Sequence, residues 1–169
     1  MFPVSNKPGV SIQCVCWRSY FCHQHWKCRN HMRNKVTLLQ DVPYMGITGN
    51  SFYKNAYEQK VVNDYVRNKR MSFNQFKNDM LAKCYAAGNW EIDDALGVKQ
   101  TLNRDSAVCR NWAGKVWDTI EFNYRKAIDN ELPAIVQNRS DCWYGYKCRT
   151  QVHKYAHASK LNHICEPRR

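Results

Sequence analysis

No apolar run in this chain approaches the roughly 20 residues that a membrane-spanning helix needs, so the sequence predicts no membrane partner. The first ten residues lack the basic-then-apolar order of a secretory leader, although a leader that was removed and replaced by Met1 is compatible with the sequence. Low-complexity tails, long Gly/Ser linkers and internal repeats are absent as well, which argues against a disordered protein. We therefore expect a globular, intracellular protein.

The sequence also lacks the motifs by which common enzymes are recognised. It contains no nucleophile with a base at motif spacing, no phosphate-cradling loop and no metal site with an open position. We interpret the acidic pair Asp93–Asp94 as a helix start and not as a catalytic dyad. No catalytic residue is assigned, and we expect a binding module in place of an enzyme.

Histidine is absent outside two segments, and both of these segments are rich in cysteine. All six histidines lie within residues 14–31 and 142–165. The chain has nine cysteines, an odd number that cannot pair completely into disulfides. Disulfide frameworks do not need histidine, whereas zinc sites commonly combine it with cysteine. The pattern favours zinc, with two ions expected, in a reducing compartment.

Acidic residues are missing from the first 36 positions, which hold six basic residues. Residues 139–169 hold seven basic and two acidic residues, while the stretch between is nearly balanced, with 13 basic and 12 acidic residues. The net charge of +12 is thus concentrated at the two metal-rich ends. This distribution suggests an anionic polymer, a nucleic acid or something similar, as the partner. Alternatively, the basic residues merely offset zinc-bound thiolates and aid solubility.

Apolar residues in the middle of the chain recur at helical spacing and predict three helices. Ser72 and Gln75 form a capping box for the second helix, Gly88 is a natural stop for it, and Pro133 ends the third. Cys84 lies on an apolar helix face and is interpreted as an inert buried thiol. The predicted elements are a strand and turn at 37–50 and helices at about 51–70, 72–88 and 112–130, with 90–108 unassigned.

The C-terminal segment has the spacing of a closed zinc site. Cys142 and Cys148 are separated by five residues, and so are His157 and His163. Two thiolates and two imidazoles complete a tetrahedral shell with no open position, which indicates a structural metal. About thirty residues bury too little surface to fold alone, so zinc would supply the folding energy. Two further residues of the segment are alternative ligands: His153 and Cys165.

The N-terminal segment offers ligands for a second zinc ion. Cys28 and His31 form a reasonable pair, which Cys14 or Cys16 could complete. The alternative is that some of these thiols are free and buried. The candidate ligands of the second zinc are Cys14, Cys16, Cys22, Cys28 and His31, with His23 and His25 between them.

The C-terminal pattern resembles the poly(ADP-ribose)-binding zinc finger, or PBZ. The shared pattern is Arg-x-x-Cys-x-Tyr-Gly-x-x-Cys followed by His-x-x-x-x-x-His, with Leu161 where the family usually has Phe or Tyr. The runs CRTQV, NHICE, NELP and FCHxxW are similar to the cysteine-rich domain of the CHFR-like checkpoint ubiquitin ligases, which also carry forkhead-associated and RING finger domains. This similarity covers roughly residues 13–166, and no RING pattern of paired cysteines occurs among the 169 residues.

The resemblance implies a mainly α, zinc-rich fold and a nuclear reader, adaptor or decoy for poly(ADP-ribose) or ADP-ribosylated proteins. It divides the chain into a cysteine-rich helical zinc domain, 1–138, and a PBZ-type finger packed on it, 139–169. Tyr144 would stack on adenine and Arg149 would fork onto phosphate, with Trp143 and Arg139 adding an aromatic surface and positive charge. The competing hypothesis is a general RNA- or DNA-binding zinc protein that uses the same basic ends and aromatic residues.

Overall fold

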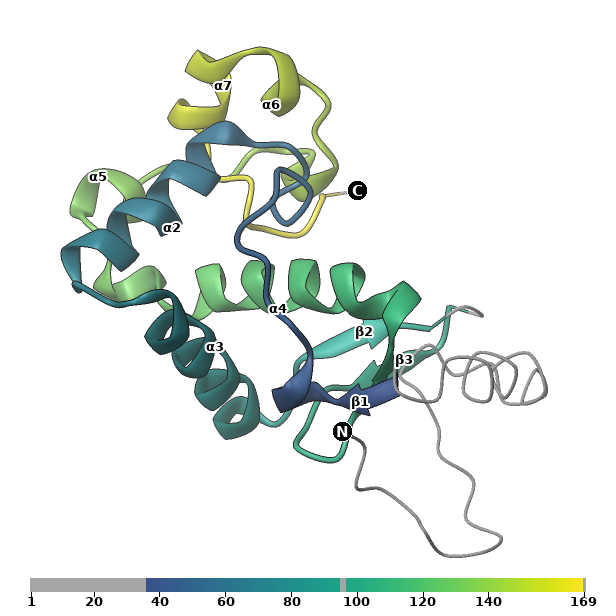
Figure 1. The fold of residues 1–169 in the computed structure, drawn as a ribbon. Helices are drawn as coiled ribbons and strands as arrows, with labels where there is room; N and C mark the ends of the chain where they lie inside the picture. The colour runs from purple at the N-terminus through teal and green to yellow at the C-terminus, as the bar shows by residue number, and fades with distance from the viewer. Residues whose placement is uncertain (1–35, 95–96, 169) are drawn as a thin grey trace, which may run out of the picture. The chain divides into compact units, whose positions relative to one another are not determined.

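The computed structural model describes residues 36–94 and 97–168. The described residues divide into two compact units, each built from two separate stretches of sequence: residues 36–44 with 84–117, and residues 45–83 with 118–168. The described residues contain six α-helices and two small antiparallel sheets (Figure 1). The structure therefore confirms the expected helices, and the mainly α fold only in part, because it also contains two small sheets.

The first unit contains both sheets. Strand β1 (Val36–Leu38) pairs antiparallel with β4 (Ala107–Cys109), and β2 (Glu91–Asp93) pairs antiparallel with β3 (Lys99–Thr101). Short 3-10 helices follow two of the strands, η2 (Leu39–Asp41) after β1 and η3 (Arg110–Trp112) after β4. The unassigned stretch 90–108 thus forms three of the four strands. The core of this unit contains Leu39, Val42, Tyr44, Cys84, Trp90, Ile92, Leu102, Val108, Val116 and Trp117.

The interpretation of Asp93–Asp94 as a helix start is wrong. Asp93 ends strand β2, and the buried Asp94 carboxylate accepts a hydrogen bond from the Val98 amide at 2.9 Å. Gln100 also donates to Asp94 at 3.1 Å, so the carboxylate closes the connection between β2 and β3. Aspartate carboxylates accept backbone amide hydrogen bonds in turns as well as at helix starts, so the acidic pair alone does not distinguish the two.

In the second unit, α2 (Ala56–Asn68) confirms the first predicted helix but begins later. Tyr53 and Lys54 have φ of 53° and 62°, left-handed values that a helix excludes. Asn55 then caps the helix, because its side chain accepts the Glu58 amide hydrogen bond at 3.0 Å. The cap fixes the first turn of α2, which contacts the C-terminal segment.

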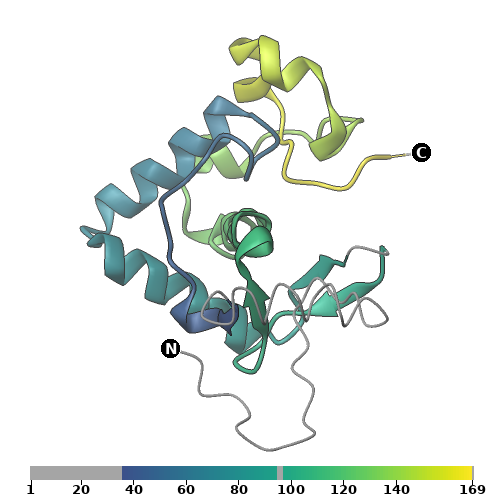
Figure 2. The same ribbon diagram turned by 45° about the vertical axis from the view of Figure 1, so that its right-hand side comes forward.

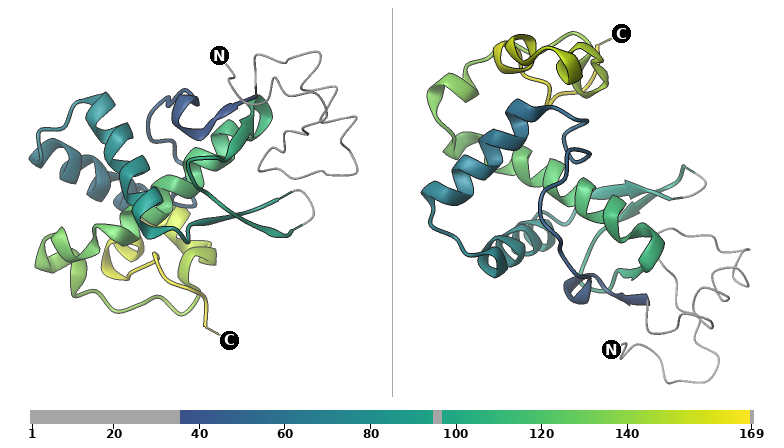
Figure 3. Two further views of the ribbon diagram at one scale, coloured as in Figure 1. Left: turned by 90° about the horizontal axis from the view of Figure 1, so that it is seen from below. Right: turned by 45° about the horizontal axis from the view of Figure 1, so that its top comes forward.

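Helix α3 (Phe73–Ala87) has the predicted boundaries. The Ser72 hydroxyl accepts from the Gln75 amide at 3.2 Å, and the Gln75 side chain accepts from the Ser72 amide at 2.7 Å, which is the predicted capping box. Gly88, with φ of 68°, follows the last turn. A short turn joins α2 to α3, as Figures 2 and 3 show from other sides.

Helix α4 (Ala113–Ala127) confirms the third predicted helix, and its apolar face is buried as expected. Ile120, Tyr124 and Ile128 are fully buried, and the Tyr124 hydroxyl donates to Asp79 at 2.6 Å. The prediction that Pro133 ends this helix is wrong: α4 stops at Ala127, the chain continues through η4 (Asp129–Glu131), and Pro133 is the N-cap of α5 (Ala134–Gln137). Among the described residues, no helix combines the length and apolar composition needed to cross a bilayer.

Residues 139–168 form the last part of the second unit. They contain η5 (Gly145–Lys147), α6 (Thr150–His153) and α7 (Tyr155–Lys160), and α7 packs against α2 (Figure 1). A buried hydrogen bond of 2.9 Å joins the Asn55 side chain to that of Gln151. The division into 1–138 and 139–169 stays a prediction about sequence modules, since the compact unit that contains 139–169 also includes 45–83 and 118–138.

Candidate metal centre

The two C-terminal cysteines flank a tight turn that backbone hydrogen bonds define. The Cys142 amide donates to the Asn162 carbonyl at 2.8 Å, which places Cys142 beside the chain that leads to His163. The Gly145 amide donates back to Cys142 at 2.9 Å, and the Cys148 amide donates to Gly145 at 3.1 Å. These bonds form η5 and direct both thiols to one side of the turn, a placement that metal ligation requires.

Gly145 is the one residue of this turn whose lack of a side chain is essential. Its φ is +49°, and a Cβ at this position would collide with the carbonyl oxygen of Cys165. That carbonyl accepts a hydrogen bond from the Tyr146 amide at 3.1 Å, so the final segment of the chain lies directly against the turn. The glycine therefore permits both the left-handed turn and the close approach of two backbone segments.

The structure brings the four predicted zinc ligands together. The candidate ligand atoms of Cys142, Cys148, His157 and His163 all lie within 4.8 Å of one another. His157 Nε2 lies 3.4 Å from Cys148 Sγ and 3.8 Å from Cys142 Sγ. Tetrahedral zinc with ordinary bond lengths separates its ligand atoms by about 3.3–3.8 Å. The distances thus fit a zinc ion bound among these four side chains.

One ring nitrogen of His163 is buried without a hydrogen-bond partner among the described residues. Its Nδ1 lies 2.9 Å from the Leu161 carbonyl oxygen and donates to it, which leaves Nε2 with a free lone pair. That Nε2 atom is buried and has no hydrogen-bond partner among the described residues. Burial lowers the pKa of His163, and the neighbouring His157 ring lowers it further, so the neutral, metal-binding imidazole is favoured. A buried acceptor of this kind fits a metal ligand.

The thiols are buried, which couples metal binding to proton release. Cys142 and Cys148 are 3% and 5% exposed. Burial raises the pKa of Cys142, so without a metal this group holds its proton. Zinc would displace the proton and stabilise the thiolate. Four protein ligands leave no position for water or substrate, so a bound zinc ion here would be structural.

The two alternative ligands of this segment lie outside the cluster. His153 ends α6 and is exposed. The Cys165 thiol donates to the carbonyl oxygens of Asn162 and Cys142, at 3.4 and 3.7 Å, and burial raises the pKa of Cys165 to about 11. Cys165 is thus a protonated thiol that supports the turn.

The candidate N-terminal ligands Cys14, Cys16, Cys22, Cys28 and His31 lie outside the described residues, so the second site stays a prediction. Cys109 is described: it is buried at the end of β4, opposite Val36 of β1. Cys84 is fully buried, and desolvation raises its pKa to about 11, which agrees with an inert thiol.

Three of the four predicted ligand-binding residues are exposed around η5. Trp143 and Tyr144 are 55% and 64% exposed, although both follow the buried Cys142, and Arg149 is exposed just after Cys148. Large aromatic side chains on a turn between buried metal ligands are available for stacking. All three side chains are therefore accessible to solvent.

Arg139 requires a correction, because its guanidinium is enclosed. Its side chain is 5% exposed and forms an ion pair with the fully buried Glu58. It also donates to the carbonyl oxygens of Val136, Ala158 and Leu161, and it lies over the Tyr57 ring. Because these donors are already used inside the protein, Arg139 presents no charge to an external ligand.

Glu58 is the structural residue that sequence analysis missed. An acid in the first turn of a helix usually stays at the surface and interacts with the helix dipole, so nothing in the local sequence signals its burial. Its partners Arg125 and Arg139 follow 67 and 81 residues later. Only the folded chain brings the three side chains together.

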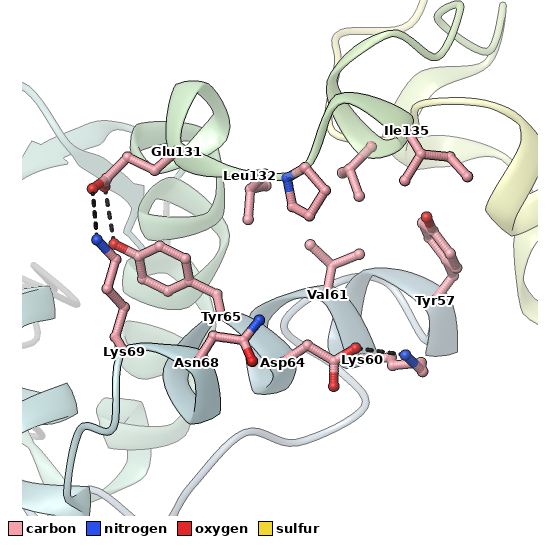
Figure 4. A pocket seen from close by; sticks show the side chains of 12 residues that line it. Tyr57, Lys60, Val61, Asp64, Tyr65, Asn68, Lys69, Glu131, Leu132 and Ile135 are labelled. Atoms are coloured by element: carbon pink, nitrogen blue, oxygen red, sulfur yellow. Dashed lines mark hydrogen bonds and ion pairs between the residues drawn. The ribbon is translucent and has the colours of Figure 1, made fainter.

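A pocket of about 490 Å³ lies between α2 and the segment from η4 to α5 (Figure 4). Val61, Leu132 and Val136 are among its apolar lining residues. Its charged groups pair with one another, Lys60 with Asp64 and Lys69 with Glu131, as the dashed lines in Figure 4 show. Trp143, Tyr144 and Arg149 are not part of its lining, so the proposed ligand surface is separate from this pocket.

Comparison with known proteins agrees with the zinc chemistry. Residues 1–128 match the family described as a cysteine-rich domain with multizinc binding regions. The E3 ubiquitin-protein ligase CHFR of Danio rerio is 32% identical over 170 residues, which cover 96% of this chain and 25% of the relative. The proteins of the same name from Xenopus laevis and Homo sapiens are 30% and 29% identical, and this chain covers 26% and 23% of them.

The chain thus spans about a quarter of the length of the curated relatives that it matches. The family description confirms zinc as the cofactor, and the four-residue cluster lies beyond the matched region, near the C-terminus. The family match covers 128 of the 169 residues and agrees with the resemblance inferred from the motifs. The chain belongs to the family of cysteine-rich domains with multizinc binding regions.

Proposed function

We propose that this chain is a zinc-dependent binding module that recognises poly(ADP-ribose) or its ADP-ribose units and acts as a reader, adaptor or decoy. The observation that carries the proposal is the exposure of Trp143 and Tyr144, 55% and 64%, on the turn between two buried metal ligands. Aromatic residues that were needed only for packing would be buried. A rigid, exposed aromatic pair instead suits the flat face of an adenine base.

Arg149 supports the same proposal. It is exposed immediately after Cys148, one of the four candidate zinc ligands, so a zinc ion bound there would hold its backbone while the side chain faces solvent. A planar guanidinium binds phosphate through two parallel hydrogen bonds. An ADP-ribose unit offers an adenine face and a pyrophosphate together, which matches an aromatic residue and an arginine on one turn.

The test is a comparison of poly(ADP-ribose) with RNA of equal charge at matched salt. We expect the parent to prefer poly(ADP-ribose), because charge attraction is common to both polymers and falls steeply with salt, whereas stacking does not. Tyr144→Ala should weaken binding of poly(ADP-ribose) by about 1–3 kcal/mol. Arg149→Lys should also weaken it, because lysine keeps the charge and loses the fork.

Two control variants separate the pocket from the general surface. Tyr155→Ala removes another exposed tyrosine, 52% exposed on α7, and should leave the preference for poly(ADP-ribose) unchanged. Lys160→Ala should lower the affinity for both polymers alike. If Tyr144→Ala binds poly(ADP-ribose) as well as the parent at moderate salt, the proposed pocket is wrong, and a general RNA- or DNA-binding zinc protein becomes the better description.

We propose further that the chain itself is not an enzyme. The relatives are named as E3 ubiquitin-protein ligases, but this chain spans about a quarter of them, and its 169 residues contain no RING pattern of paired cysteines. A four-ligand cluster also leaves no open metal position for hydrolysis. We expect no ubiquitin transfer when the chain is mixed with a charged conjugating enzyme alone. Ubiquitin chains formed in that mixture would overturn this part of the proposal.

The nuclear location expected from the family resemblance belongs to the same proposal. Microscopy of the tagged chain, with and without Tyr144→Ala, would show whether nuclear retention depends on the ligand surface. Retention that both proteins share would point to the basic charge instead.

A further inference from the structure

One carbonyl oxygen next to the metal centre accepts two hydrogen bonds. The Leu161 carbonyl accepts from His163 Nδ1 at 2.9 Å and from Arg139 Nη1 at 3.1 Å. His163 presents its other nitrogen, Nε2, to the cluster of candidate zinc ligands. The carbonyl therefore links a zinc ligand to a buried guanidinium.

The Arg139 guanidinium is in turn bound by Glu58 of helix α2. Arg139 Nη2 lies 2.5 Å from Glu58 Oε1, and Arg139 Nε donates to the Val136 carbonyl at 3.0 Å. Glu58 is fully buried and also accepts from Arg125 Nε of α4, at 2.7 Å. The position of Arg139 is thus set by Glu58, which lies 105 residues before His163, and Glu58 is itself bound by Arg125, 38 residues before His163.

We propose that Arg139 and Glu58 are positioning residues for the zinc ligand His163, so that α2 supports the metal centre through a continuous chain of hydrogen bonds. Two donors on one carbonyl oxygen fix its direction, and the carbonyl fixes both the tautomer and the ring orientation of His163. Partners of this kind orient metal-bound histidines, and their loss typically weakens metal binding by about 10–100-fold. The proposal concerns zinc retention and is independent of what the exposed face binds.

The connection explains why a buried ion pair occurs here at all. Taking charged groups out of water is costly, and apolar residues of similar size often give equal stability. A network that only stabilised the packing could therefore be replaced by apolar residues without loss of stability. A network that also orients a metal ligand could not, because no apolar side chain donates to the Leu161 carbonyl.

The test uses the full 169-residue chain loaded with zinc and the variant Arg139→Gln. The histidine side-chain signals of His157 and His163 in nitrogen-15 NMR spectra report this site alone. A chelator is added until the zinc-bound signals disappear, and the free zinc concentration at the midpoint gives the affinity. We expect the midpoint of Arg139→Gln to shift by at least tenfold, with faster solvent exchange of the His163 Nδ1 proton.

The matched control is Tyr124→Phe, which removes a part-buried hydrogen bond to Asp79 in the same unit and none of the hydrogen bonds from Glu58 to His163. It should lower thermal stability and leave the zinc midpoint unchanged. Arg139→Lys is the second variant if Arg139→Gln does not fold; its single ammonium cannot bridge Glu58 and Leu161, so the midpoint should shift in the same direction. The proposal is overturned if the Arg139 variants keep the parent midpoint, or if Tyr124→Phe shifts it equally.

Discussion

Cys148→Ser is expected to remove one zinc ion per chain and to unfold residues 139–168 while the rest of the chain stays folded. A serine hydroxyl does not replace a thiolate as a zinc ligand. The segment has few buried apolar groups beyond its metal ligands, chiefly Ala158 and Ile164. In zinc-finger peptides the metal contributes about 10–16 kcal/mol of apparent binding free energy, so a segment of this size depends on it.

Elemental analysis and limited proteolysis measure this effect. We expect at least two zinc ions in the parent, one fewer in Cys148→Ser, and rapid cleavage confined to the C-terminal segment. Cys165→Ser is the matched control, because Cys165 lies in the same segment but outside the four-residue cluster. It should retain the parent zinc content. Less than one zinc ion per parent chain, or unchanged zinc in Cys148→Ser, would contradict the assignment.

Glu58→Ala is expected to lower the free energy of unfolding of the second unit by about 3–5 kcal/mol. Glu58 is fully buried between Arg125 and Arg139, whose side chains are 1% and 5% exposed. Removing the acid leaves the buried Arg139 without its carboxylate partner, and Arg125 keeps only Asp129, which is half exposed. Removing one partner of a buried ion pair destabilises the fold far more than the intact pair stabilises it relative to apolar residues.

The change in the free energy of unfolding is measured by urea unfolding, monitored by circular dichroism with zinc in excess. Asp64→Ala on the same helix is the control, since its ion pairs with Lys60 and Arg67 are at the surface and should matter little. Glu58→Gln should lie between the two, because the amide keeps one acceptor oxygen and no charge. Equal midpoints for Glu58→Ala and Asp64→Ala would show that the buried network does not stabilise the fold.

Local signals in the sequence predicted the helices well, because caps and apolar faces are determined by neighbouring residues. The Ser72–Gln75 box and Gly88 gave both ends of α3. The start of α2 was placed too early, because Phe52 continues the apolar pattern while Tyr53 and Lys54 adopt left-handed backbone. Apolar spacing alone does not reveal such a turn.

Apart from the strand expected within 37–50, which overlaps β1, the strands and the buried network could not be predicted in the same way. Strands β1 and β4 are three residues long and pair across about 70 residues of sequence, so neither shows a useful alternation. The four zinc ligands were found because spacing and residue type specify them together, and the structure places them within 4.8 Å. Arg139 was misplaced because its motif position gives no information about Glu58, which lies in a distant helix.

The sequence separation of these contacts bears on the order of folding during synthesis. Glu58 is translated 81 residues before Arg139, and Asn55 is translated 96 residues before Gln151. Asn55 and Glu58, at the start of α2, therefore leave the ribosome well before Gln151 and Arg139 have been made. The long loops must close before these contacts form, which makes assembly slow relative to the formation of individual helices. These contacts of the second unit can form only after residues 139 and 151 have been made, so a ribosome that stalls before residue 139 leaves Glu58 without Arg139.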